Sequence, residues 1–230
     1  MFSEAIASAA SGKPILIHDS KSRENETDIV FASQFATPEA IRFMRKNGGG
    51  MICVTVRERE ASKIGLDYVG NMLNLKDKGI LFSGDIRYDT TSPFSLWINS
   101  RDTFTGISDI DRSATIMGFS GFIEKLPAYN GSAMSKFSSM FRVPGHVPVI
   151  IAREGYFRVR SGHTELSTYL MEKAGLIPSA TVVEMIGDDG RSMSPDEAQA
   201  FAEKHSLTFI EGSEIIRKWS NDEGYGNGGI

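Results

Sequence analysis

The first hydrophobic segments of the chain are short and closely spaced. Residues 13–19 (KPILIHD) and 27–33 (TDIVFAS) are apolar runs of strand length, and such runs indicate buried β-strands. Because only a short polar segment separates them, we do not expect a strand–helix–strand unit, whose crossover takes a dozen residues or more. Later apolar runs predict further strands at 51–56, 92–100, 146–153 and 181–187.

Helix signals stand between these runs. Thr37 and Ser194 are each followed by proline, a pattern typical of a helix N-cap and first helical position. The glycines at 48–50 end the first of these helices, and another helix is expected to begin near His163. Because strands and helices are mixed without strict alternation, the sequence predicts an α+β fold: a single compact domain with a mixed β-sheet flanked by helices.

The length of 230 residues suits one large domain or two small ones, and the absence of a visible linker or internal repeat favours one. We expect this domain to span residues 1–220, followed by a flexible tail at 221–230. Residues 101–121 are rich in Ser, Thr, Asp and Gly, which predicts a long polar loop leading into a short helix. Residues 127–142 are expected to be irregular. Long loops inside compact domains are often functional.

The composition argues against several classes of protein. The net charge is −4 with no basic run, so nucleic acid is not an expected partner. No apolar stretch reaches the roughly 20 residues that span a membrane, and the N-terminus does not resemble a signal peptide. The single cysteine, Cys53, excludes an internal disulfide and a cysteine-rich zinc site, and it favours the reducing cytoplasm.

The segment SRENETDIVF (22–31) places unusual charge at the start of a predicted strand. Arg23 is followed by the carboxylates of Glu24, Glu26 and Asp28 before the chain turns apolar. A solvated turn has this composition, and so has a site that holds a metal ion and a phosphorylated substrate. The segment alone does not decide between them.

The segment RSGHTEL (160–166) is a second candidate. His163 and Thr164 fall at a predicted helix N-terminus, where free N–H groups and the helix dipole favour phosphate, and Arg160 would add a charged partner. A plain helix cap is an equally good explanation. Oxygen and imidazole ligands suit Mg²⁺ or Mn²⁺, so Glu24 with His163 would form a sparse metal site completed by water and substrate.

Several other residues are candidates individually. Glu184 stands inside an apolar run, where a carboxylate is costly unless it is paired or used; the alternative is a solvent-facing position on an edge strand. His146 follows a Pro-Gly turn and is either catalytic or a satisfied strand-edge histidine. Cys53 is expected to be a buried structural thiol, His18 structural and His205 a surface residue.

Taken in chain order, several segments resemble those of the 3,4-dihydroxy-2-butanone 4-phosphate synthases of riboflavin biosynthesis. The matching segments are RENETDIVF (23–31), TGISDIDRSATI (105–116), PGHV (144–147), GHTE (162–165) and the GDDG that follows Glu184. They extend from about residue 13 to 210, nearly the whole chain. Thr27 stands where this family usually has glycine, and GGGM (48–51) replaces its more common G-S-G-[IV].

The resemblance implies a lyase that converts D-ribulose 5-phosphate to L-3,4-dihydroxy-2-butanone 4-phosphate and formate. It implies Mg²⁺ or Mn²⁺ as cofactor, two ions per site, and a homodimer with active sites at the interface. The length and the single cysteine predict the single-activity form, without the GTP cyclohydrolase II domain of some relatives. The implied metal ligands are Glu24 and His163, and the implied catalytic groups are Asp19, Glu26, His146 and Glu184. The implied substrate contacts are Arg23, Glu24, Asp28, Thr105, Arg160, Ser161, Gly162, His163, Thr164 and Glu184.

Two other functions fit the same residues. One is another Mg²⁺-dependent isomerase or lyase of pentose phosphates. The other is a protein that binds a phosphosugar without transforming it. Release of formate from ribulose 5-phosphate distinguishes the three possibilities.

Overall fold

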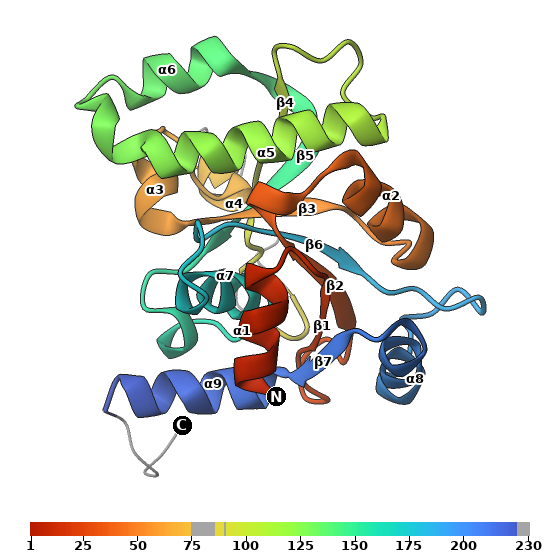
Figure 1. The fold of residues 1–230 in the computed structure, drawn as a ribbon. Helices are drawn as coiled ribbons and strands as arrows, with labels where there is room; N and C mark the ends of the chain where they lie inside the picture. The colour runs from red at the N-terminus through yellow and green to blue at the C-terminus, as the bar shows by residue number, and fades with distance from the viewer. Residues whose placement is uncertain (75–85, 90, 225–230) are drawn as a thin grey trace.

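A seven-stranded mixed sheet forms the centre of the protein (Figure 1). The computed structural model describes residues 1–74, 86–89 and 91–224. The strands run in the spatial order β4-β5-β3-β6-β2-β1-β7. Their bounds are β1 Ile15–His18, β2 Thr27–Ala32, β3 Cys53–Arg57, β4 Phe94–Ser100, β5 Phe141–Ala152, β6 Ala180–Glu184 and β7 Thr208–Glu211. The predicted strands are therefore present, and β1 and β2 pair antiparallel, which agrees with the expectation that they do not form a strand–helix–strand unit.

The sheet combines both strand directions, which confirms the predicted mixed sheet. β1 pairs with β7 and β3 with β5 in parallel, whereas β2–β6, β3–β6 and β4–β5 are antiparallel. β6 is the central strand, so the alternative of an edge-strand position for Glu184 is wrong.

Helices cover both faces of the sheet. Their bounds are α1 Phe2–Ala10, α2 Pro38–Asn47, α3 Glu58–Lys63, α4 Val69–Asn74, α5 Asp109–Lys125, α6 Ala133–Met140, α7 His163–Lys173, α8 Pro195–His205 and α9 Gly212–Asp222. The Thr37 side chain accepts from the Ala40 amide and the Ser194 side chain from the Glu197 amide, which confirms both predicted caps. In the part of the chain that the structure describes, no helix is long and apolar enough to cross a membrane.

Alternation along the strands separates two apolar layers. On β2, Ile29 and Phe31 belong to one cluster, and Val30 and Ala32 to the other. Because side chains alternate between the faces of a sheet, Asp28 shares a face with Val30. That face carries α1, α7 and α9.

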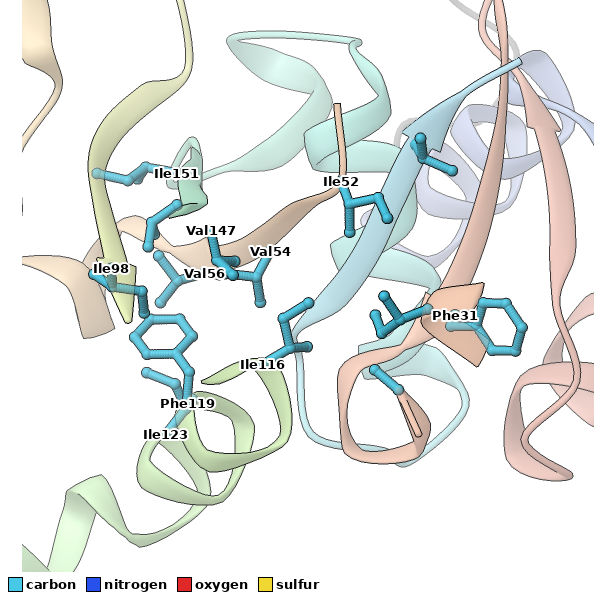
Figure 2. Packing of buried hydrophobic residues seen from close by; sticks show 14 of the residues in the cluster. Phe31, Ile52, Val54, Val56, Ile98, Ile116, Phe119, Ile123, Val147 and Ile151 are labelled. Atoms are coloured by element: carbon cyan, nitrogen blue, oxygen red, sulfur yellow. The ribbon is translucent and has the colours of Figure 1, made fainter. Parts of the chain in front are cut away.

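The opposite face carries α2, α5 and α8. Figure 2 shows Ile116 and Phe119 of α5 lying over Val54 and Val56 of β3, all of them fully buried. This dry layer holds the sheet rigid on one side. The polar side chains of the candidate site gather on the other side.

The segment after β4 differs from the expectation. The predicted short helix within 101–121 is α5, which is 17 residues long and begins at Asp109. The helix was not predicted at this length because it contains many polar residues. Ser108 caps it by accepting from the Asp111 amide, and the buried Thr115 hydroxyl accepts from the Ser100 amide at 2.9 Å. Serine and threonine in such positions favour the prediction of a loop, because their side chains also form hydrogen bonds readily with the local backbone.

Two further boundaries differ. Residues 127–142, predicted to be irregular, contain α6 and the first residues of β5. The predicted tail at 221–230 begins inside α9, which continues to Asp222, and residues 225–230 lie outside the described residues.

Candidate functional site

A cavity of about 250 Å³ opens on the face of the sheet that carries α7. Its walls come from the loop between β1 and β2, from the central strands, from the segment before β4 and from the start of α7. Of the residues predicted from the sequence, seven line it: Arg23, Glu24, Glu26, Asp28, Arg160, His163 and Glu184. The fold thus brings together side chains as far apart in the chain as Arg23 and Glu184.

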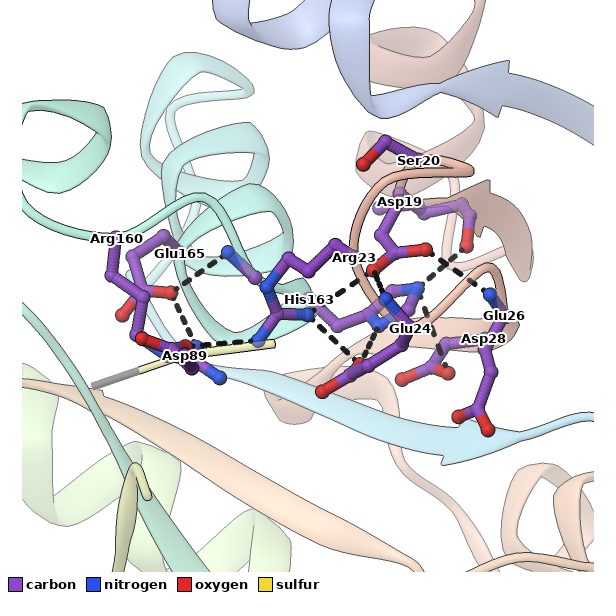
Figure 3. Close-up of polar contacts among 12 residues, drawn as sticks. Asp19, Ser20, Arg23, Glu24, Glu26, Asp28, Asp89, Arg160, His163 and Glu165 are labelled. Carbon is purple, nitrogen blue, oxygen red and sulfur yellow. Dashed lines mark hydrogen bonds and ion pairs between the residues drawn. The ribbon is translucent and has the colours of Figure 1, made fainter. Parts of the chain in front are cut away.

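Asp19 organises the loop between β1 and β2 (Figure 3). Its Oδ2 accepts from the Glu24 amide at 3.0 Å and from Arg23 Nη1 at 3.2 Å, and its Oδ1 accepts from the Glu26 amide at 3.1 Å. The Asp19 carboxylate is completely buried by these contacts. It therefore sets the position of Glu24 and Glu26, while Asp19 itself is not among the residues that line the cavity.

Glu24 and His163 form a close pair between the loop and α7. Glu24 Oε2 lies 3.2 Å from His163 Nδ1 and 2.9 Å from Arg23 Nη1. Burial opposes ionisation of Glu24, but the His163 hydrogen bond and the Arg23 charge outweigh it and lower the pKa of this carboxyl to about 2. Burial likewise disfavours charge on His163, yet the carboxylates of Asp28, Glu24 and Asp19 raise its pKa to about 9.

These groups have the composition of a metal site. One ligand atom each from Asp19, Glu24 and His163 lies within 4.8 Å of the others. His163 Nε2 is 3.2 Å from the Ile17 carbonyl, which holds the ring so that Nδ1 faces Glu24. Hydrogen bonding at one ring nitrogen is the usual way to orient the other toward a metal.

Asp28 and Glu184 face each other across neighbouring strands. They are register partners on β2 and β6, and both line the cavity. Burial raises the pKa of Asp28, and the Glu184 charge reinforces this shift while His163 opposes it. Asp28 Oδ1 is buried, has no hydrogen-bond partner among the residues that the structure describes, and lies 3.7 Å from His163 Nε2. Asp28 therefore holds a proton more readily than an ordinary aspartate does.

Gly50 gives Glu184 its position. Glu184 Oε2 accepts from the Met51 amide at 2.7 Å, and a Cβ at Gly50 would lie only 2.2 Å from the same oxygen. The glycine run at 48–50, predicted to end α2, therefore also makes room for the carboxylate.

Two nearly buried arginines converge on the N-terminus of α7. Arg23 Nη2 donates to Asp89 Oδ2 at 3.1 Å and Arg160 Nε to the same oxygen at 2.5 Å. Arg160 Nη1 also donates to the fully buried Glu165 at 2.6 Å. Gly162, the N-cap of α7, permits this approach, because a Cβ there would lie 2.3 Å from Arg160 Nη1 and 2.7 Å from Arg23 Nη2.

The remaining predicted residues near α7 fall beside this cluster. Thr164 is buried in the first turn of the helix, and Ser161 is half-buried just before the Gly162 cap. The Glu26 carboxylate accepts from the Ser192 hydroxyl, which ties the loop to the segment after β6.

His146 and Thr105 do not line the cavity. They form a separate group in which His146 Nδ1 lies 3.0 Å from Asn99 Nδ2, and Asn99 Nδ2 donates to the Thr105 carbonyl at 3.2 Å. His146 is exposed, and Phe104 beside Thr105 is 96% exposed. The fold of a single chain therefore does not bring all of the predicted site residues into one cavity.

Sequence reasoning missed several residues of the site. Glu165, the partner of Arg160, stands at the third position of α7, where an acid after a helix start is a recognisable signal. Asp89 and Tyr88 carry no motif. Cys53 is buried as expected, and burial raises the pKa of its thiol, but its side chain also borders the cavity.

Comparisons with known proteins extend over almost the whole chain. The model of the 3,4-dihydroxy-2-butanone 4-phosphate synthase family matches residues 3–218. A synthase of this name from Methanosarcina mazei is 38% identical over 223 residues, covering 94% of this chain and 89% of the relative. One from Methanothermobacter thermautotrophicus is 38% identical over 225 residues, covering 95% of this chain and 96% of the relative.

A solved structure supports the same fold. The crystal structure of a 3,4-dihydroxy-2-butanone 4-phosphate synthase in complex with two magnesium ions matches with a TM-score of 0.75. The match covers 96% of this chain and 97% of the other, at 24% identity. The predicted α+β domain with a mixed sheet is thereby confirmed.

Proposed function

Because the chain belongs to the 3,4-dihydroxy-2-butanone 4-phosphate synthase family, we propose that it converts D-ribulose 5-phosphate to L-3,4-dihydroxy-2-butanone 4-phosphate and formate in riboflavin biosynthesis. The observation that carries the proposal is one cavity lined by an acidic loop, a histidine and two arginines. A cytoplasmic enzyme suits the single buried thiol of Cys53.

The residues present fit a divalent cation. Asp19, Glu24 and His163 offer two carboxylates and one imidazole within reach of a common point, a donor set that suits Mg²⁺ or Mn²⁺. We propose Glu24 and His163 as direct ligands and Asp19 as the group that orients Glu24. A related synthase was crystallised with two magnesium ions, which supports two ions here. Bound there, the metal would stabilise negative charge that develops on the substrate oxygens.

The arginines suit the phosphate group of the substrate. Arg23 and Arg160 present guanidinium N–H groups beside the N-terminus of α7, and both features favour phosphate. Ser161, Gly162 and Thr164 surround that helix start. Phosphate bound there would leave the sugar carbons to extend toward the carboxyl groups and His163.

The carboxyl groups supply acid and base for a reaction with several proton transfers. Removal of the C3 proton, α to the ketone, gives an enediol, and loss of water at C1 gives a methyl ketone. A 1,2-shift of the carbon skeleton follows, and water then releases C4 as formate. Asp28, whose pKa is raised by burial, suits donation of a proton to the hydroxyl that leaves C1, and Glu184 and Glu26 border the same space as proton acceptors.

We propose that a second copy of the chain completes the site. The predicted catalytic residue His146 and the predicted substrate contact Thr105 lie outside the cavity of their own chain, in an exposed group next to Phe104 and Ile110. Exposed apolar side chains around polar functional groups are typical of an interface between subunits. A homodimer would bring His146 and Thr105 of one subunit to the cavity of the other.

The test is formate production. The purified protein with ribulose 5-phosphate and Mg²⁺ should release formate and 3,4-dihydroxy-2-butanone 4-phosphate in equal amounts, and a chelator should stop the reaction. Isomerisation without formate would indicate another pentose phosphate enzyme. Substrate binding without any product would indicate a binding protein, and either result would defeat the proposal.

A further inference from the structure

Asp89 connects the two arginines of the site (Figure 3). Its Oδ2 accepts from Arg23 Nη2 at 3.1 Å and from Arg160 Nε at 2.5 Å. All three side chains are nearly buried, with 11% of Asp89, 8% of Arg23 and 6% of Arg160 exposed. A charged oxygen therefore sits between two guanidinium groups at the wall of the cavity.

The neighbouring residues hold Asp89 in place. The Arg23 guanidinium lies over the Tyr88 ring, 5.2 Å from its centroid, and the Asp89 amide bonds to the Ile86 carbonyl at 3.4 Å. Ile86 and Tyr88 both line the cavity. The segment 86–89 thus borders the cavity and brings its carboxylate to both arginines.

The carboxylate has the chemistry of a substitute phosphate. An anionic oxygen shared by two arginines beside a helix N-terminus is the arrangement that phosphate groups adopt. Arg23 has two further acidic neighbours, Asp19 and Glu24, and Arg160 has Glu165. Each arginine would keep a counter-charge if Asp89 were to leave.

We propose that Asp89 is an internal competitor of the substrate phosphate: its carboxylate occupies the phosphate position between Arg23 and Arg160, and the phosphate displaces it on binding. This inference rests on the proposed function in one respect, that the ligand is phosphorylated. A phosphate dianion replaces both hydrogen bonds and brings more charge than the carboxylate it displaces. An uncharged hydroxyl group cannot displace the carboxylate in this way. Asp89 therefore makes the site select phosphorylated sugars.

The test is binding of inorganic phosphate to the full chain, measured by calorimetry without divalent metal and at fixed ionic strength. Asp89→Asn removes the competing charge while keeping the shape, so it should lower the Kd for phosphate by about fivefold or more. Asp89→Glu retains a carboxylate, so its Kd for phosphate should stay close to that of the unchanged protein. A residue that merely supported the arginines would, on removal, weaken binding instead.

The control is Asp222→Asn. Asp222 is also a carboxylate held by two cations, Lys173 and Lys218, and lies at the end of α9 outside the cavity, so the same change in net charge should leave the Kd unchanged. Should Asp89→Asn fail to fold, Asp89→Ser provides the same comparison. Unchanged or weaker phosphate binding in the folded variant would overturn the proposal. Because this readout needs neither metal nor turnover, it is independent of the formate assay.

Discussion

If His163 binds the metal, as we propose, its proton competes with the metal for the ring nitrogen. Burial disfavours this proton, but the surrounding carboxylates raise the pKa of His163 to about 9. A metal ligand must offer an unprotonated nitrogen, so a cation competes with a proton throughout the neutral range. Glu24, whose pKa is about 2 despite its burial, stays ionised and adds no pH dependence there.

Metal affinity should therefore rise with pH. We expect the Kd for Mn²⁺ to fall about tenfold per pH unit between pH 6 and 8. It should level off near pH 9, where His163 loses its proton even in the absence of metal. Titration calorimetry in two buffers of different ionisation enthalpy should show release of about one proton per site at pH 7.

The Asp28 carboxylate provides the matched comparison. It is the main charge that raises the pKa of His163, so Asp28→Asn should move the levelling point to lower pH and weaken the proton competition. A Kd that does not change from pH 6 to 8 would contradict the assignment of His163 as a ligand.

At the scale of elements, the start of α7 fixes the geometry of the arginines. Gly162→Ala keeps an ordinary backbone conformation, with φ of −93°, but its Cβ would lie 2.3 Å from Arg160 Nη1, so the guanidinium groups must move. Displacement of binding groups by about 1 Å costs on the order of 100-fold. We expect kcat/KM for ribulose 5-phosphate to fall about 10- to 100-fold, with the thermal transition little changed.

Gly121→Ala is the control for this substitution. Gly121 lies inside α5, and a Cβ there meets nothing within 4 Å. The change should raise the free energy of unfolding by about 0.5–1 kcal/mol, the gain of alanine over glycine in a helix, with full activity. Equal kcat/KM in the two variants would show that the space at Gly162 has no role in the site.

The elements that the sequence predicted best are those whose signals are local. Thr37 and Ser194 identified the starts of α2 and α8, because a cap acts on its own helix. α5 was underestimated, since the buried hydroxyl of Thr115 bonds to a distant strand and nothing in its neighbourhood reveals that partner. Glu184 was recognised as a buried acid, but its partner Asp28 follows only from the pairing of β2 with β6.

At the scale of the whole molecule, the family motifs divide into two groups. Motif resemblance pointed to Glu24, His163, His146 and Thr105 together, yet only the first two line one cavity. A motif records that residues share a function and not that they share a chain, so the sequence could not show this division. Asp89 shows the converse: it accepts hydrogen bonds from both Arg23 and Arg160, and its part of the sequence carries no motif.

Mixed dimers test whether two chains build one site. His163→Ala and His146→Ala should each abolish formate release, because each removes a group from every site of a homodimer. Co-expression of the two variants with different affinity tags should restore about a quarter of the normal activity, since half of the dimers are mixed and each has one intact site. Mixed dimers isolated through both tags should have about half of the normal activity. No recovery in the isolated mixed dimers would mean that His146 acts within its own chain, and the shared site would have to be abandoned.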